Sequence, residues 1–161
     1  EIASCLVGSE MCIRDRSRRL ALIPLRPRYW DMYRDGSKIW ELRKISHSPR
    51  GVDGLIIYAT APVSRIVGEV DLISTHVGYV NDVWDVVKDG CGITRKQYDL
   101  YYQDQEIAIA YRLGNVYEYP TSLGMLPAPQ GYRYLRQEMY HQFRCQTGRP
   151  RLVHASCGCA D

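Results

Sequence analysis

Residues 36–43 read GSKIWELR, and this stretch decides how the first half of the chain is interpreted. Before it, Pro27 suits the first turn of a short helix, and Gly36 supplies the left-handed residue that commonly ends one. Apolar and charged side chains then alternate over residues 40–43, as they do along a strand with one buried face. The stretch therefore predicts a helix, a tight turn and a strand, with Lys38 emerging close to the turn.

The rest of the chain supplies further strand and helix patterns. Thr94 and Gln97 have the spacing of a capping box, and Asn81 or Asp82 can cap an earlier helix. A turn at Gly114-Asn115 is expected to fold two strands into a hairpin. The expected elements are strands at 20–25, 37–45, 55–58, 64–74, 107–113 and 116–119, and helices that start near residues 27, 82 and 95.

This order of elements predicts a mixed β/α fold, a small and mostly antiparallel β-barrel decorated by about three helices. We expect one domain at residues 20–135. Residues 1–19 lack a helical or strand period and are expected to be disordered. Within them, residues 7–16 (VGSEMCIRDR) resemble translated sequencing-adapter sequence, which would make them foreign to the natural protein. Residues 136–161 are expected to form a tail that begins as a helix and then becomes disordered.

Charge is distributed unevenly, although the whole chain carries a formal net charge of only +3. Residues 26–50 hold seven basic and three acidic residues, whereas residues 81–119 hold four basic and seven acidic ones. The basic segment also contains Tyr29, Trp30 and Trp40. Basic residues interleaved with aromatic ones are typical of a surface that holds phosphate and stacks a base. A solvated charged face over core aromatics would have the same composition.

Composition also bears on location and cofactors. No apolar run approaches the roughly 20 residues of a membrane helix, and residues 1–16 lack the features of a signal peptide. We therefore expect a soluble, cytoplasmic and monomeric protein with no membrane partner.

Cys145, His154, Cys157 and Cys159 carry side chains suited to zinc, but one residue separates the last two cysteines instead of the two of a CxxC pair. We expect no metal and no cofactor.

The stretch GSKIWELR has the form GxKxxExR, which resembles the signature of the activating signal cointegrator homology (ASCH) domain, a relative of the RNA-binding PUA fold. Further blocks resemble that domain in the same order: residues 55–63 (LIIYATAPV), residues 66–69 (IVGE), the tyrosine-rich helix around Tyr98 and residues 129–135 (PQGYRYL). The resemblance covers about residues 20–135. It implies a PUA-like pseudo-barrel of five or six strands, a cleft beside the helix-to-strand turn, and a role with RNA or modified nucleosides.

The motif suits the recognition of a nucleotide. Glu41 and Arg43 lie two apart on a strand and share a face, so a carboxylate and a guanidinium could together hold the edge of a base. Lys38 could then meet a phosphate or act on a carbonyl. Strict alternation would place Lys38 opposite Glu41, so the three converge only if residues 37–39 still belong to the turn or a bulge intervenes. The alternative is a structural Glu41–Arg43 pair beside a solvated Lys38.

The resemblance and the charge pattern together give a set of candidate site residues. Lys38 and Glu41 are the candidate catalytic pair. Tyr58 could instead belong to the core, and Arg133 could tie the last segment to the barrel. Glu69 is a further candidate carboxylate, although an outward-facing strand glutamate is more often a surface charge. The predicted nucleotide-binding residues are Arg26, Trp30, Lys38, Glu41, Arg43, Tyr58, Thr60 and Arg133.

The sequence favours an RNA- or nucleotide-binding domain and leaves two alternatives. Some proteins that this chain resembles remove the acetyl group from N4-acetylcytidine with the motif lysine near the reacting carbonyl, and Lys38 matches that lysine. Those proteins have a threonine at the position of Glu41. They also have a glutamate in a helical region, where this chain has Asp89 instead. For the ribonuclease activity of other relatives, Lys38 and Arg43 would stabilise a phosphorane while Glu41 or Tyr58 moved protons. The second alternative is a protein-interaction domain of a larger complex.

Overall fold

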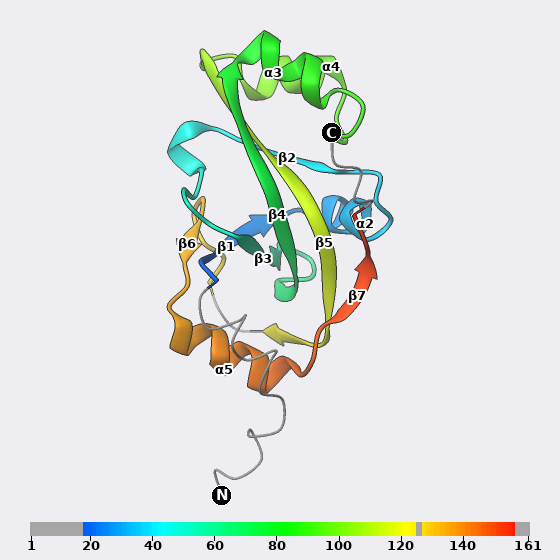
Figure 1. Cartoon of the computed structure of the whole chain (residues 1–161), viewed down its shortest axis with the longest axis vertical. Helices are drawn as coiled ribbons and strands as arrows, with labels where there is room; N and C mark the ends of the chain where they lie inside the picture. Colours follow the sequence, from blue (N-terminus) through cyan, green and yellow to red (C-terminus); the bar gives the residue numbers. More distant parts are fainter. Residues whose placement is uncertain (1–17, 125–126, 157–161) are drawn as a thin grey trace, which may run out of the picture.

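The computed structural model describes residues 18–124 and 127–156, and one seven-stranded sheet organises them (Figure 1). The strands are β1 (Leu20–Leu25), β2 (Trp40–Arg43), β3 (Gly54–Ala59), β4 (Arg65–Tyr79), β5 (Ile107–Gly124), β6 (Arg133–Tyr134) and β7 (Arg151–His154). The helices are α2 (Pro27–Arg34), α3 (Val80–Val87), α4 (Arg95–Tyr101) and α5 (Gln137–Thr147), with one turn of 3-10 helix, η1 (Ile45–His47). The predicted mixed α/β class is confirmed.

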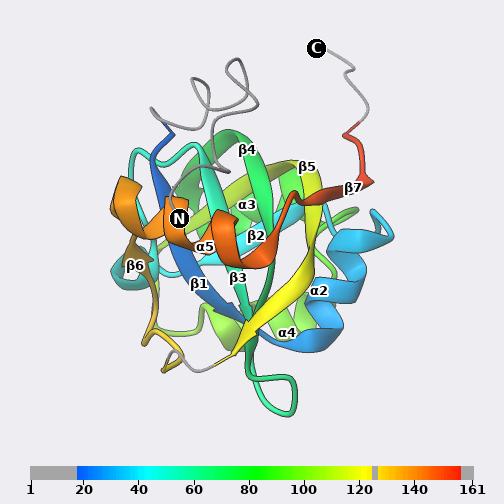
Figure 2. The same cartoon turned by 90° about the horizontal axis from the view of Figure 1, so that it is seen from below.

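The sheet follows the order β2-β5-β4-β3-β1-β6, and β7 pairs with β5 beside that path. β1 and β3 run parallel, and the other pairings among the described residues are antiparallel, as predicted. The two end strands, β2 and β6, do not pair with each other within the described residues, so a closed barrel is not confirmed. Figure 2 shows α5 crossing the near end of the molecule and α2 lying along one side.

β4 and β5 form one long antiparallel ribbon (Figure 1). The hairpin predicted at Gly114-Asn115 is wrong, because β5 continues through these residues and stays paired with β4 on both sides of them. The register shifts on either side of Leu72, which lies opposite Leu113. Such irregularities let a strand bend while its pairing continues, so the glycine and asparagine occupy a bulged region instead of a turn.

α3 and α4 cover the far end of this ribbon (Figure 1). The capping box of Thr94 and Gln97 is present at the start of α4, as predicted. α3 has no side-chain cap, so the predicted cap by Asn81 or Asp82 is wrong; the helix follows β4 directly, and both residues fall in its first turn. Buried side chains of the two helices meet Leu42 of β2, so this helical pair forms a wall beside the motif strand.

Two further apolar clusters fill the interior. β3 is buried along its whole length, as its continuous apolar run predicts. One cluster packs Trp30 and Tyr33 of α2 against β1 and β3. The other joins Tyr58 to Tyr140 and Phe143 of α5. The tyrosine rings contribute apolar area while their hydroxyl groups remain available to polar partners.

Residues 136–156, for which the sequence predicts a helix followed by a disordered tail, form a helix and a strand that pack on the sheet. α5 begins at Gln137, as the helical start predicts, and buries Tyr140 and Phe143. β7 then pairs with β5 over residues 116–118. Backbone pairing supplies the order that the polar composition of this segment does not indicate. The predictions made for residues 1–17 and 157–161 fall outside the described residues.

Candidate functional site

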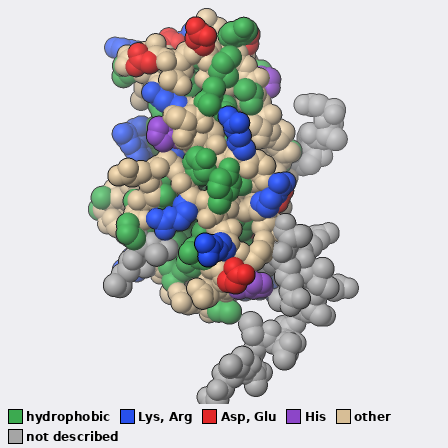
Figure 3. Space-filling model, turned by 90° about the vertical axis from the view of Figure 1, so that its left-hand side faces the viewer, with side chains coloured by type: hydrophobic (Ala, Val, Ile, Leu, Met, Phe, Trp, Pro, Cys, Tyr) green, Lys and Arg blue, Asp and Glu red, His purple; other side chains and the backbone are tan. Residues whose placement is uncertain are grey.

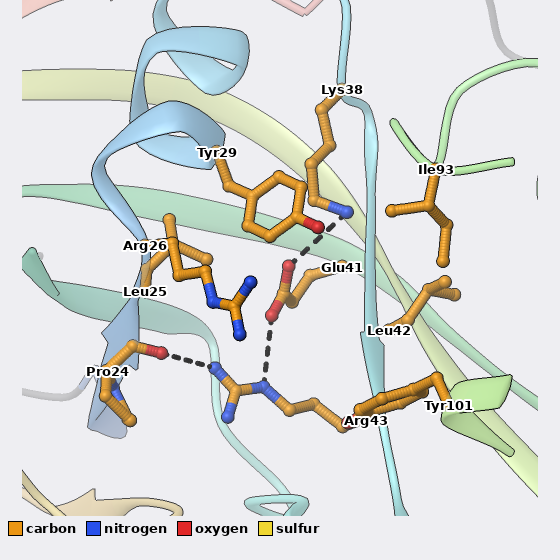
Figure 4. A pocket seen from close by; sticks show the side chains of 10 residues that line it. All are labelled: Pro24, Leu25, Arg26, Tyr29, Lys38, Glu41, Leu42, Arg43, Ile93 and Tyr101. Carbon is orange, nitrogen blue, oxygen red and sulfur yellow. Dashed lines mark hydrogen bonds and ion pairs between the residues drawn. The ribbon is translucent and has the colours of Figure 1, made fainter. Parts of the chain in front are cut away.

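Residues of the GxKxxExR stretch line a cavity of about 200 Å³ beside α2, β1 and β2, which we call the cleft (Figure 4). Four of the predicted site residues are brought together here. Arg26 comes from the residue before α2, Lys38 from the turn, and Glu41 and Arg43 from β2. The cleft is lined by Pro24, Leu25, Arg26, Tyr29, Lys38, Glu41, Leu42, Arg43, Ile93 and Tyr101.

Lys38 reaches the cleft because β2 begins only at Trp40, so that residues 37–39 precede the strand. This was the condition under which Lys38 and Glu41 could converge. The Nζ atom of Lys38 donates hydrogen bonds to the backbone carbonyls of Trp40 (2.7 Å) and Cys91 (2.6 Å). It also lies 3.6 Å from Oε2 of Glu41. The three donors of the ammonium group therefore have three acceptors within the protein.

Burial lowers the pKa of Lys38, because an ammonium group that is only 4% exposed has lost most of its hydration. The negative charge of Glu41 opposes this shift, and the positive charge of Arg43 adds to it. Lys38 therefore releases its proton more readily than a surface lysine does. A neutral amine is the form in which a lysine acts as a base or a nucleophile.

Glu41 lies at the centre of a buried network. Its Oε2 accepts a hydrogen bond from the hydroxyl of Tyr33 (2.7 Å), and its Oε1 accepts one from Nε of Arg43 (3.1 Å). Burial and then the charge of Glu41 raise the pKa of Tyr33 well above its ordinary value, so that hydroxyl remains a donor. Each carboxylate oxygen carries two lone pairs, so Glu41 keeps capacity to accept a hydrogen bond from a ligand.

Arg43 fixes the position of its guanidinium with backbone contacts from two other segments. Its Nη2 donates to the carbonyl of Pro24 on β1 (3.0 Å), and its Nη1 lies 3.4 Å from the carbonyl of Gly131, before β6. The backbone carbonyl of Arg43 accepts a hydrogen bond from the hydroxyl of Tyr102 (3.1 Å). A guanidinium has five N–H donors, so some remain for a ligand without any rotation of the side chain.

Arg26 and Tyr29 complete the rim of the cleft. Arg26 is exposed, and its side chain makes no hydrogen bond or ion pair within residues 18–124 and 127–156. Figure 4 shows its guanidinium directed toward Glu41 and Arg43. The Nζ atom of Lys38 lies 5.3 Å from the centroid of the Tyr29 ring, within the range of a cation–π contact. Arg26 is therefore the cation of the cleft that is available to an anionic ligand.

The other predicted site residues do not line the cleft. Trp30 is 5% exposed within the first core cluster, and Tyr58 is 6% exposed in the second. Thr60 follows β3, where its amide donates a hydrogen bond to the carbonyl of Leu25. Arg133 is exposed on β6. Trp30 and Tyr58 occupy buried positions because large rings contribute most to core packing.

Three tyrosines at or beside the cleft, Tyr29, Tyr33 and Tyr101, are not among the predicted site residues, although Tyr29 and Tyr33 belong to the basic, aromatic segment that the sequence singles out. Tyr29 and Tyr33 lie on α2, and Tyr101 is the last residue of α4. A tyrosine on a packing stripe needs a polar partner for its hydroxyl, so Tyr33 could have been connected with a buried carboxylate. Tyr101 lies far from the motif in sequence, and no local signal links it to the cleft.

A second buried carboxylate, Glu69, lies outside the cleft. It is 3% exposed, so the surface position expected for it is wrong. It accepts hydrogen bonds from Tyr119 (2.6 Å), Tyr140 (3.2 Å) and Arg144 (3.3 Å), and Arg18 lies 3.8 Å away. Two of these partners belong to α5, so Glu69 connects that helix to the sheet.

Neither a metal centre nor a membrane span is found in the part of the chain that the structure describes. No three or more His, Cys, Asp or Glu side chains lie together there in a way that could hold a metal ion. Cys157 and Cys159, which the sequence raised as potential zinc ligands, fall outside that part. None of its helices is both long and apolar enough to cross a bilayer.

Comparison with solved structures identifies the same fold in another protein. A crystal structure of a point mutant of ZmASCH from Zymomonas mobilis is 25% identical, covers 83% of this chain and 99% of its own, and superposes with a TM-score of 0.73. The structure described as ASCH from Zymomonas mobilis is 24% identical over 81% of this chain and 96% of its own, again with a TM-score of 0.73.

Sequence comparison gives shorter similarities, and no protein-family model matches the sequence. The large ribosomal subunit protein uL22 of Ureaplasma parvum is 32% identical over 87 residues, which cover 51% of this chain and 28% of that protein. The ATP synthase subunit alpha of the same species is 33% identical over 91 residues, 53% of this chain and 11% of that protein. The chain thus spans less than a third of the length of these curated relatives.

Proposed function

The chain is an ASCH-domain protein, and we propose that its cleft binds a nucleotide unit of RNA. The observation that carries this proposal is the convergence of Lys38, Glu41 and Arg43 on one cavity, with Arg26 at its rim. Three cationic side chains and one carboxylate give the cleft an excess of positive charge, which favours an anionic ligand. Such a ligand would also need polar groups that Glu41 and Arg43 can recognise.

We propose a different role for each of these residues on the basis of its hydrogen bonds. Arg26 is the cation without a partner among the described residues, so we assign the phosphate contact to it. Glu41 can accept, and Arg43 can donate, a hydrogen bond at adjacent points, which suits the edge of a base. Lys38 uses its donors on two carbonyls and on Glu41. Its role in binding is to hold Glu41 in place.

The size and lining of the cleft favour a small unit. A volume of about 200 Å³ is below the roughly 300–1,000 Å³ of sites for drug-sized ligands. Leu42, Ile93 and the ring of Tyr101 supply apolar surface that could lie against the faces of a base. We therefore assign a base and part of its sugar to the cleft and leave the rest of the strand outside it.

A hydrolase acting on a modified nucleoside is the second candidate, and the lowered pKa of Lys38 favours it. A buried lysine with a lowered pKa is a recurrent feature of enzyme sites. Asp89, the acidic residue considered for this activity, is exposed and lines a different cavity, so Glu41 is the carboxylate that such a reaction would use. The donors of Lys38 all have partners, so at least one of them would have to exchange its partner during the reaction, whereas Oε1 of Glu41 keeps a lone pair that is free among the described residues.

Binding of a fluorescent single-stranded RNA hexanucleotide over a range of salt concentrations tests the first proposal. The affinity of the wild type should fall as salt rises. Arg26→Ala should weaken binding and reduce the slope of log affinity against log salt by about 0.7, the value for one phosphate contact with a single strand, with the melting temperature unchanged. Lys96→Ala, an exposed cation on α4, is the matched control. Equal binding by the two variants would sink the proposal.

The second candidate is tested by incubating the protein with N4-acetylcytidine and separating the products by chromatography. Deacetylation by the wild type and by Arg26→Ala, but not by Lys38→Ala, would favour the hydrolase. Absence of turnover together with salt-dependent RNA binding would leave binding as the function of the cleft.

A further inference from the structure

Next to the cleft lies a surface that the proposed function does not use. It consists of Tyr132, Tyr134 and Arg50, and we call it the tyrosine platform. The rings of Tyr132 and Tyr134 meet edge to face with their centroids 5.2 Å apart, and Tyr134 is 51% exposed. The Tyr134 hydroxyl accepts a hydrogen bond from the amide of Arg50 (2.8 Å) and donates one to its carbonyl (3.3 Å). The position of the exposed ring is thus fixed by the loop that follows η1.

The tyrosine platform adjoins the cleft through Arg43. The Nη1 atom of Arg43 lies 3.4 Å from the carbonyl of Gly131, and Tyr132 is the next residue in the chain. The ring of His47 on η1 also lies close to Gly131. A strand that leaves the cleft on the Arg43 side can therefore reach the tyrosine platform.

Charge on this side of the molecule suits a polyanion. Arg50 is exposed, and its guanidinium forms no ion pair or hydrogen bond with any residue that the structure describes. The neighbouring Tyr134 raises the pKa of Tyr132, and the positive charge of Arg50 opposes that shift. Figure 3 views the side that carries η1 and β6: Lys and Arg are spread across it between hydrophobic side chains, and acidic side chains lie mainly at its upper and lower ends.

We propose that the tyrosine platform binds the nucleotide adjacent to the one in the cleft, so that the ligand is single-stranded RNA and not a free nucleoside. This inference rests on the proposed function of the cleft. An exposed aromatic ring offers a face on which a base can stack, and a neighbouring arginine can meet the phosphate, a combination that single-strand binding surfaces share. The bases of a duplex are already stacked on one another, so only an unpaired strand can use the platform.

The experiment compares a single-stranded RNA hexanucleotide with the corresponding nucleoside monophosphates, which compete for the labelled hexanucleotide. The wild type should bind the hexanucleotide at least about tenfold more tightly than any monophosphate, because one stacked base contributes that much. Tyr134→Ala should weaken hexanucleotide binding about tenfold and leave monophosphate binding unchanged. Tyr134→Phe, which keeps the ring but loses its two hydrogen bonds to Arg50, should lose less affinity than Tyr134→Ala. Arg50→Ala should reduce the salt slope by about 0.7, because it removes one phosphate contact. The backbone groups of residue 50 that hold Tyr134 remain, so the ring should stay in place.

Tyr79→Ala is the control, since Tyr79 is 65% exposed on β4. The platform is overturned if Tyr134→Ala binds the hexanucleotide as Tyr79→Ala does, or if Tyr134→Phe loses as much affinity as Tyr134→Ala. Equal affinity of the wild type for the hexanucleotide and a monophosphate would reject the platform and retain the cleft. Failure to bind either ligand would reject the proposed function and the platform with it.

Discussion

Tyr33 of α2 and Glu41 of β2 share a hydrogen bond of 2.7 Å at the floor of the cleft, and both side chains are almost completely buried. The bond joins α2, which precedes the turn at residues 36–38, to β2, which follows it. Since Arg43 holds the other oxygen of Glu41, the carboxylate is positioned by the two elements that enclose the turn. The motif is therefore one structural unit as well as a candidate binding site.

This unit predicts a loss of stability at alkaline pH. Tyr33 and Tyr119 have pKa values raised well above 10.0, chiefly by burial, so both keep their protons in the folded state when the unfolded chain has begun to release them. Their contribution to stability is complete below pH 10 and is lost as the pH rises above it. Urea unfolding from pH 8 to pH 11 should show the free energy of unfolding falling above pH 10. Tyr33→Phe should reduce that fall and Tyr79→Phe should not; identical slopes would refute this assignment.

Lys38 should have the opposite dependence on pH. Its pKa is lowered in the folded state from 10.5, so above the folded pKa the unfolded state binds more protons, and stability attributable to Lys38 rises with pH up to about 10.5. Lys38→Met should cost about 3 kcal/mol, since it removes one partner of a buried charged network. The difference in unfolding free energy between wild type and Lys38→Met should increase toward pH 10.5. A difference that stays constant with pH contradicts the lowered pKa.

Gly36 predicts a specific clash with the C-terminal strand. Its φ is +78°, and a Cβ added there would overlap the imidazole of His154 on β7. Gly36→Ala should therefore destabilise the protein by about 2 kcal/mol, partly from backbone strain and partly from the overlap. In a double-mutant cycle measured by thermal unfolding, adding His154→Ala to Gly36→Ala should restore the part of the lost stability that comes from the overlap, and the part due to backbone strain should remain. Simple additivity of the two substitutions would show that His154 does not oppose the added methyl group.

The contacts of Glu69 predict that the packing of α5 on the sheet depends on this one carboxylate. Glu69→Gln removes the charge that Arg18 and Arg144 both contact, and should cost about 3 kcal/mol, as breaking a buried ion pair does. Hydrogen exchange should increase first in α5, whose Tyr140 also bonds to Glu69. Glu118→Gln, which removes ion pairs of a more exposed carboxylate, should cost at most about 1 kcal/mol. Equal costs for the two variants would mean that Glu69 does not anchor the helix.

Features that depend on local chemistry could be predicted from the sequence. Pro27 and Gly36 set the limits of α2, and the capping box of Thr94 sets the start of α4, because each acts through its own backbone or that of near neighbours. The same reasoning failed at Gly114-Asn115. Those residues suit a turn, but pairing with β4 on both sides keeps the strand extended.

The candidate site divides in the same way. The convergence of Lys38 with Glu41 depended on where β2 begins, which the alternation of side chains could not decide. Trp30 was predicted to contact the ligand, but it lies in the core. The prediction failed because the composition of a segment does not show which of its aromatic side chains face the core and which face solvent. Glu69 was expected at the surface because its partners on α5 come about seventy residues later in the chain.

The hydrogen bond from Lys38 to the carbonyl of Cys91 has a mechanical consequence. Cys91 follows α3, and the carbonyl of its neighbour Gly90 also accepts hydrogen bonds from the amides of Ile39 (2.8 Å) and Trp40 (3.0 Å). The loop between α3 and α4 is thus bonded to the segment that carries the lysine. A shift of α3 and α4 on the sheet would therefore displace the ammonium group of Lys38, which contacts Glu41. The position of the two helices on the sheet and the arrangement of the polar groups in the cleft are therefore coupled.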